Sequence, residues 1–320
     1  MARRVIAMLL VTVAVIMAGL LYFAYVVRTG LVRELSLWAD QRRQEGWTVA
    51  ARLAPPASTL FAPGIELRGT ELDGAGDLLP GGFRLAADRV ELRADLMQPK
   101  ILHVTIGGNV TVRLGSLPAV TFVDDHLTGT VTLGNHGKIE AIAIDGKNLR
   151  SADLGGMSVG TLQALLTLDA SGATADVRTE ALVVPVNPYG LGQHLSDVTL
   201  HAALVGWPPD AGSRGARADV WRASGGRIDI SRLVVGWGPL GLVGEASLGL
   251  DQALQPDGTA KVQVRGYQAV LDGLGDNGAL VAAVIAATTP GDEADFDIRI
   301  KKSAVNVDRI RVVKIPRIDW

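Results

Sequence analysis

The chain has 320 residues, of which 48% are hydrophobic and 20% are charged, and it contains no cysteine. This composition allows a packed core and excludes disulfide frameworks, thiol nucleophiles and cysteine-ligated metal centres. The formal net charge of -2 gives no basic surface for nucleic acid, so no nucleic-acid partner is expected.

The N-terminal segment is predicted to be a membrane anchor. Residues 5–27 carry no charge, and a helix of this length spans a hydrocarbon core of about 30 Å. A cleavable signal peptide is the alternative, but the apolar run continues past Ala18-Gly19 without a good cleavage site. We therefore predict an uncleaved single-pass inner-membrane anchor over residues 1–28, with the main domain in the periplasm. The candidate anchor residues are Val5, Leu10, Val15, Leu20, Phe23 and Val27.

A helical stalk is predicted over residues 29–46. Leu31, Leu35 and Trp38 follow the three-to-four spacing of one helix face, so we expect this stripe to pack on the structure that follows. Gly46 stands where a left-handed C-cap residue ends a helix.

From Trp47 onward the hydrophobic pattern changes to a period of two, which is typical of half-buried strands. The clearest stretch is 226–266, where leucines of one parity alternate with Glu245 and Ser247. Turn residues separate the alternating runs. The predicted fold is therefore mainly β: a long antiparallel meander-type twisted sheet with a few short helices. We expect a β-rich N-terminal half over 47–206 and a β-rich C-terminal half with short helices over 207–320.

Several local features follow from the same pattern. Asn109 after two glycines predicts a hairpin turn, and residues 169–172 predict another. Arg232 shifts the parity between its flanking apolar residues, which indicates a β-bulge. One or two helical turns are expected over 216–223, and two short helices over 267–289.

One face of the 226–266 stretch is the candidate hydrophobic surface, because its apolar residues share one parity on each strand. The residues assigned to it are Leu240, Leu242, Ala246, Leu248, Leu250, Val262 and Val264.

Three stretches carry a resemblance to a known family: residues 38–47 (WADQRRQEGW), 92–104 (LRADLMQPKILHV) and 225–266. Together they resemble the proteobacterial family called domain of unknown function 2125, over nearly the whole chain. These motifs consist of turns and strand parity, so the resemblance implies a fold and no reaction. More loosely, the layout is similar to AsmA-like envelope proteins, which join one inner-membrane helix to a long sheet and are associated with lipid movement.

No motif in the chain supports catalysis. Residues 156–160 match G-x-S-x-G, but that elbow needs a strand before it and a helix after it, and this context is missing here. Asp124, Asp125 and His126 are adjacent, so their side chains would point in alternate directions rather than converge on a metal. We therefore expect no catalytic residue, no cofactor, no metal and no enzymatic activity.

The sequence is compatible with two functions of different classes. The first is the handling of lipid or another hydrophobic ligand in the cell envelope, with membrane lipid as the partner. The second is a structural or assembly role, in which another envelope protein pairs with an exposed strand edge, because backbone pairing needs almost no sequence signature.

Overall fold

A computed structural model describes the backbone of residues 2–54, 63–74, 82–95, 97–98, 100–115, 117–135, 138–151, 153, 156–185, 191–209, 212–269, 292–301, 303–307, 310–314 and 317–318. The side chains of residues 2–20, 124–126, 214 and 310–314 lie outside the described residues.

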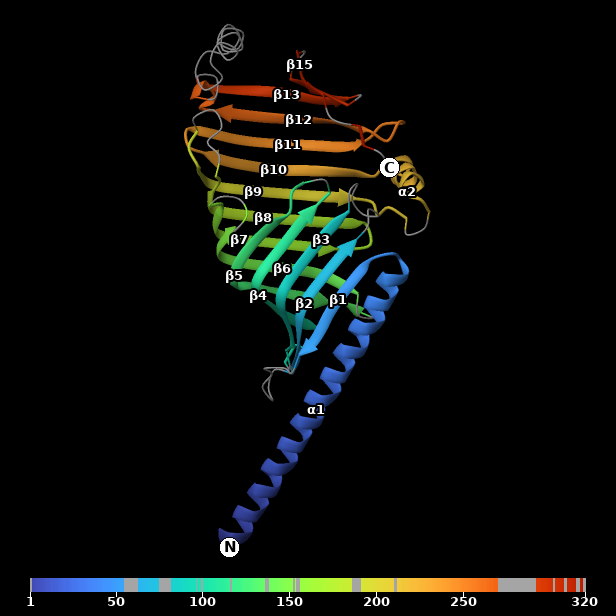
Figure 1. The fold of residues 1–320 in the computed structure, drawn as a ribbon, viewed down its shortest axis with the longest axis vertical. Helices are drawn as coiled ribbons and strands as arrows, with labels where there is room; N and C mark the ends of the chain where they lie inside the picture. Colours follow the sequence, from blue (N-terminus) through green and yellow to red (C-terminus); the bar gives the residue numbers. More distant parts are fainter. Residues whose placement is uncertain are drawn as a thin grey trace. The chain divides into compact units, whose positions relative to one another are not determined.

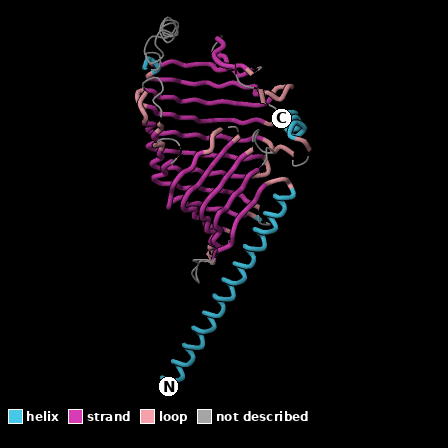
Figure 2. The backbone as a smooth tube through the Cα atoms, viewed as in Figure 1, coloured by secondary structure: helices cyan, strands magenta, loops and turns pink. Residues whose placement is uncertain are grey.

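Figure 1 shows the helices and strands of this part of the chain, and Figure 2 shows the predominance of strand. They are α1 (Ala2–Gln44), β1 (Thr48–Ala54), β2 (Gly64–Gly74), β3 (Phe83–Ala94), β4 (Ile101–Leu114), β5 (Val120–Leu133), β6 (Ile139–Ser151), β7 (Ser158–Leu168), β8 (Gly172–Val183), β9 (His194–Val205), α2 (Arg214–Ala223), β10 (Arg227–Trp237), β11 (Leu240–Leu250), β12 (Pro256–Arg265), β13 (Glu293–Lys301), β14 (Ala304–Val307) and β15 (Ile310–Lys314).

Strand order in the sheet equals chain order from β1 to β15. The strand pairs whose register is described are all antiparallel. This is the connectivity of a meander, so the predicted fold class, mainly β with few helices, is confirmed. Short turns between strands that are neighbours in sequence favour this arrangement.

The chain forms two compact units: one comprises Met1–Ala119 with Asp124–Ile139, and the other comprises Val120–Val123 with Glu140–Trp320. We refer to them as the first and second units. The predicted boundary between a half over 47–206 and a half over 207–320 is a different division of the chain, and it stays a prediction.

Helix α1 runs from the predicted anchor into the predicted stalk. Among the described residues, no helix is long and apolar enough to cross a membrane. Most of the predicted span, from Val5 to Leu20, lies outside the described side chains. The anchor therefore stays a prediction.

The stalk part of α1 packs on β1 and β2. Leu31 and Leu35 are half-buried and Ala39 is buried, whereas Trp38 is 39% exposed. The packed stripe therefore follows a spacing of four residues, and the assignment of Trp38 to it was wrong. Gly46 has φ +87°, as predicted for a left-handed residue that ends a helix.

In the first unit, a bulge between β3 and β4 lies at the position of a predicted hairpin turn. Strand β4 runs unbroken from Ile101 to Leu114, so the hairpin turn predicted at Asn109 was wrong. The register instead shifts between Ala87 and Arg89, which marks a bulge. Asn109 donates to Asp88 Oδ2 from its backbone nitrogen (2.8 Å) and from its side-chain amide (2.9 Å). At this bulge β4 has one residue more than β3. The two bonds hold that residue in place, so the chain continues as a strand and does not turn back.

The second unit agrees with the local predictions. Strands β7 and β8 pair across residues 169–172, and the register shifts between Ile230 and Leu233, beside Arg232. Helix α2 covers the predicted helical turns at 216–223, and Ser213 caps its N-terminus with a side chain that accepts from the backbone nitrogen of Ala216. The two helices predicted over 267–289 fall almost entirely outside the described residues.

In the strands of the second unit, the buried hydrophobic side chains lie at strand ends. Leu149, Val159, Leu195, Ala294 and Ala304 are all buried, and each lies within two residues of the end of its strand. Tyr267 and Ala294 form a small cluster with Val264 and Phe296. The middle of the sheet therefore does not form the buried core.

The packing of Trp221 predicts the effect of one glycine substitution. A Cβ at Gly226 would lie 2.3 Å from Trp221 Cε2, and the indole is fixed by a 2.9 Å hydrogen bond from its Nε1 to the Gly206 carbonyl. We expect Gly226→Ala to destabilise the fold by about 1–3 kcal/mol through overpacking, measured by denaturant unfolding. Gly249→Ala is the control, because its nearest neighbour would be 3.6 Å away. Equal stability of the two variants would contradict this packing.

The turn between β7 and β8 predicts a dependence on pH. Hydrogen bonds from the Ser171 side chain and backbone, with one from the Gly172 nitrogen, lower the pKa of Asp169 below its usual 3.8. Asp169 thus contributes stability that is fully present above pH 3.8 and is lost as pH falls through the lowered pKa. The difference in thermal midpoint between wild type and Asp169→Asn should shrink over that acidic range. A difference that does not vary with pH would refute the assignment.

Candidate functional site

The main candidate surface is one face of the second unit, built by the pleat of its strands. Side chains at alternate positions leave the same face, and the register aligns them across neighbouring strands. The longest row crosses the nine strands from β6 to β14 without a charged or polar side chain. It consists of Ile142, Leu166, Ala175, Ala202, Ile230, Ala246, Ala260, Ile298 and Val307.

A second row runs parallel to the first, two residues away on each strand except β10, where the distance is three residues. Its members are Ile144, Ala164, Val177, Leu200, Leu233, Gly244, Val262 and Phe296. The bulge at Arg232 keeps Ile230 and Leu233 on the same face, although their spacing is odd. Further rows on either side contain Leu242 with Val264 and Leu248 with Ile300. We call the face formed by these rows the apolar face.

The apolar face is not covered by another layer of described structure. Every residue of the longest row is half-buried and none is fully buried. Apart from contacts between neighbouring strands, the largest contact between described elements of the second unit is the small one of α2 with β11. The rows are therefore shielded by their lateral neighbours, and no described element lies over them.

The structure brings the predicted hydrophobic residues together. Alternation along β11 puts its members on the apolar face, and register joins them to β12, with Leu242 opposite Val264. All seven are half-buried: Leu240, Leu242, Ala246, Leu248, Leu250, Val262 and Val264. The continuation of the apolar face over β6 to β10 was not predicted from the sequence. The same alternation in each earlier strand, for example Leu162, Leu166 and Leu168, carried that signal.

The candidate anchor residues are less fully described. Val5, Leu10, Val15 and Leu20 lie outside the described side chains. Phe23 is 40% exposed and Val27 is half-buried. Beside them, the apolar and aromatic side chains of Leu21, Tyr22, Tyr25 and Val26 are also exposed.

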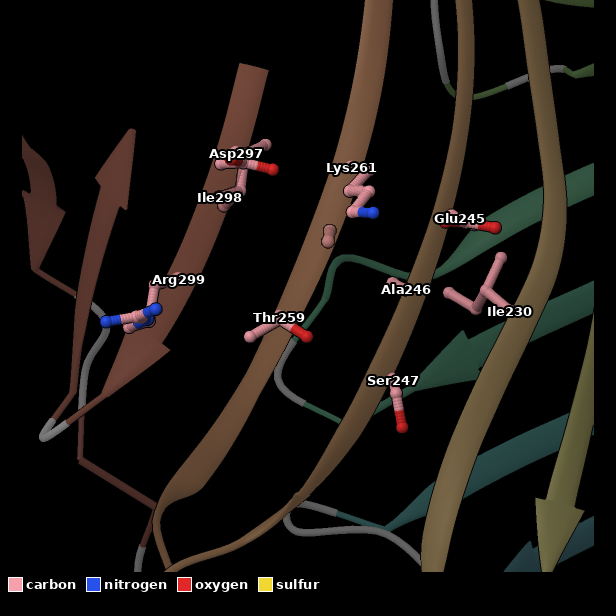
Figure 3. Close-up of a pocket in the computed structure, with 10 residues that line it drawn as sticks. Ile230, Glu245, Ala246, Ser247, Thr259, Lys261, Asp297, Ile298 and Arg299 are labelled. Carbon is pink, nitrogen blue, oxygen red and sulfur yellow. The ribbon is translucent and has the colours of Figure 1, made fainter. Parts of the chain in front are cut away.

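A hollow with a volume of about 780 Å³ lies over β10 to β13. Figure 3 shows its lining residues in rows that cross neighbouring strands. Six of them are polar and belong to the face opposite the apolar face, by the alternation of each strand. These six are Glu245, Ser247, Thr259, Lys261, Asp297 and Arg299.

Charges in this hollow alternate in register. Lys261 lies between Glu245 on β11 and Asp297 on β13. Opposite charges on neighbouring strands stabilise a sheet by roughly 0.2–1 kcal/mol per pair. The Ser247 hydroxyl donates to Asp229 Oδ1 at 2.6 Å, and Arg227 donates to Asp229 Oδ2 at 2.8 Å. This pattern describes a charge-balanced, solvated face rather than a convergent catalytic set.

The motifs weighed for catalysis do not gain support from their placement. Ser158 of the G-x-S-x-G match begins strand β7, so a strand follows it where an elbow would have a helix. His201 pairs with Asp176, and both side chains are about half exposed. Among residues with described side chains, no three His, Cys, Asp or Glu residues lie close enough to hold a metal ion. The side chains of Asp124, Asp125 and His126 lie outside that search.

Comparison with protein families gives one match. The family model described as "Uncharacterized protein conserved in bacteria (DUF2125)" matches residues 25–316. The chain belongs to this family. Its matched region begins within α1 and covers the described strands to β15. No curated protein and no solved structure matches the chain.

The family match confirms the resemblance inferred from the three sequence stretches. The looser resemblance to AsmA-like envelope proteins stays a prediction, as does the expectation that the chain has no enzymatic activity. The family's description assigns no reaction or ligand. The surfaces of the molecule are therefore the remaining source of information about its function.

Proposed function

We propose that this protein is a single-pass inner-membrane protein whose periplasmic sheet handles lipid or another hydrophobic ligand. The observation that carries the proposal is the apolar face, which spans nine strands and whose longest row is half-buried and not fully buried at any position. With neighbouring strands about 4.8 Å apart, the longest row is ~38 Å long. A bilayer of about 40–45 Å holds two lipids end to end, so the row is longer than the acyl chains of a single lipid and can accommodate them.

The size of the apolar face supports the proposal that it binds a hydrophobic ligand. Four rows spaced by two residues cover roughly 20 Å along the strands, so the face measures about 700–800 Å² in projection. Monomers rarely expose contiguous apolar patches beyond a few hundred Å², and larger ones mark interaction sites. At about 25 cal/mol per Å² of apolar surface removed from water, even partial cover would contribute several kcal/mol.

The chemistry of the rows favours acyl chains. The two longest rows consist of aliphatic side chains and glycine, with Phe296 as the single aromatic residue. Interfaces between proteins are enriched in aromatic residues and arginine at their centres. A broad aliphatic surface with no hydrogen-bonding pattern instead suits an apolar ligand that binds without directional contacts.

The anchor places the sheet beside its source of lipid. Residues 5–27 carry no charge, and Tyr22, Phe23 and Tyr25 are exposed toward the end of this stretch. Aromatic side chains at such a position are typical of the membrane–water interface. Cytoplasmic placement of the N-terminus, with translocation of the large β body, completes the proposal.

Pairing of an envelope protein along a strand edge is the second candidate. The strand order leaves β1 and β15 with one neighbour each. Arg43 partly blocks the β1 edge, because its guanidinium donates to the Val49 carbonyl at 3.1 and 2.7 Å. The β15 edge is therefore the better site for such a partner.

Substitution on the apolar face tests the lipid proposal. Val262 lies on β12 opposite Gly244 and Phe296. We expect Val262→Asp to reduce lipid that co-purifies with the full chain by about tenfold, because a charge on this surface loses its hydration beneath an acyl chain. Quantitative lipid mass spectrometry measures the effect.

Gln263→Asp is the matched control, since Gln263 is exposed on the opposite face of the same strand. It should retain the lipid. Equal lipid in both variants and wild type would refute the proposal and leave edge pairing as the better account.

Topology can be tested by cysteine labelling, because the chain has no native cysteine. We expect Gln263→Cys to react with a membrane-impermeant maleimide in intact spheroplasts. Ala2→Cys should react only after permeabilisation. Reaction of both sites, or of neither, before permeabilisation would contradict the proposed orientation.

A further inference from the structure

The first unit carries a row of three arginines, of which one has an ion pair within the part of the unit that the structure describes. Arg52 on β1 is in register with Arg68 on β2, and Arg68 is in register with Arg89 on β3. All three side chains are exposed. Like charges directly opposite each other on neighbouring strands are unfavourable. We call this set the arginine row.

Acidic partners for the row are scarce. Arg68 pairs with Glu66 at 2.7 Å, and Glu91 on the neighbouring strand pairs with Arg93 at 2.8 Å. Both carboxylates are therefore already engaged. Within the described part of the chain, the side chains of Arg52 and Arg89 have no hydrogen bond or ion pair. The row keeps a positive surplus.

The backbone makes room for the row. The register shifts directly beside Arg52 on β1 and beside Arg89 on β3. Bulges re-aim side chains and occur often next to functional sites. The Arg89 guanidinium lies over β4 at Gly107, where a Cβ would come within 2.6 Å of its Nη2. Glycine at that position therefore gives the side chain its place on the surface.

The location of the row points to a lipid headgroup, and this step rests on the proposed anchoring. Strand β1 runs back from the end of α1 toward the N-terminal end of the helix (Figure 1). Helix α1 rises ~24 Å between Arg28 and Gln44, and β1 returns ~13 Å from Thr48 to Arg52. The row would then lie near the headgroup layer, which begins where the apolar span ends.

We propose that Arg52, Arg68 and Arg89 form a binding site for the phosphate group of an anionic phospholipid. Guanidinium groups present paired donors that match phosphate oxygens and remain charged at any physiological pH. A phosphate between neighbouring strands would replace the unfavourable contact between like charges by attraction. The chemistry is that of a phosphate anion, whether the phosphate is free or part of a headgroup.

The test uses the full chain in a neutral detergent and short-chain lipids that bring little apolar surface. Wild type should bind dihexanoyl phosphatidylglycerol at least about tenfold more tightly than dihexanoyl phosphatidylcholine, with affinity that falls as salt rises. The variant R52Q/R68Q/R89Q should lose that preference. R232Q/R265Q/R299Q removes three exposed arginines from strands of the second unit and should keep it.

Inorganic phosphate at matched ionic strength distinguishes the two sources. Competition shows that the row takes a phosphate anion by itself, and absence of competition shows that it needs the headgroup. Equal lipid preference in wild type and R52Q/R68Q/R89Q, or equal loss in the control variant, would overturn the site. If the triple variant fails to fold, R52Q alone should weaken binding by about threefold.

The outcome is separable from that of the lipid proposal. Co-purified lipid on the apolar face should survive in R52Q/R68Q/R89Q, whereas headgroup preference should survive in Val262→Asp. The amount of co-purified lipid therefore tests the apolar face, and the headgroup preference tests the arginine row.

Discussion

The pleat of the antiparallel strand is the constraint on which this structure depends. Successive side chains leave opposite faces, and a register error of one residue would exchange the two faces of a strand. In the second unit the register holds from β6 to β14, so apolar side chains of nine strands meet in continuous rows. The bulge beside Arg232 is part of this order, because it restores the face after an odd number of residues.

In the part of the second unit that the structure describes, a sheet organised in this way has an apolar face that no second layer covers. Its buried side chains lie at strand ends, where Tyr267 and Ala294 pack together, while the centre of the apolar face is half-exposed. Folded domains ordinarily bury such a face against helices or another sheet. A ligand on the apolar face would act as such a layer, and the charge-balanced opposite face, with Lys261 between Glu245 and Asp297, suits water.

The sequence predicted the elements that depend on local signals. Alternation revealed the strands, the Asp169–Gly172 turn and the bulge at Arg232, because each has a signature within a few residues. The turn predicted at Asn109 failed because Gly107 and Gly108 suit a bulge as well as a turn, and the partner Asp88 on β3 decided between them. The continuation of the apolar face and the arginine row depend on register across strands, which no single segment contains. Function was not predictable from motifs, since the sequence motifs point to a fold and name no reaction.

The most direct test of the account is to map where a lipid contacts the sheet. A phospholipid with a photoactivatable acyl chain can be incorporated into membranes that contain the full chain, and the cross-linked residues identified by mass spectrometry. The account predicts adducts at alternate positions of β11 and β12, on Leu242, Ala246, Leu248 and Val262 and not on Glu245, Ser247 or Lys261. Adducts confined to α1, or spread equally over both parities, would contradict it.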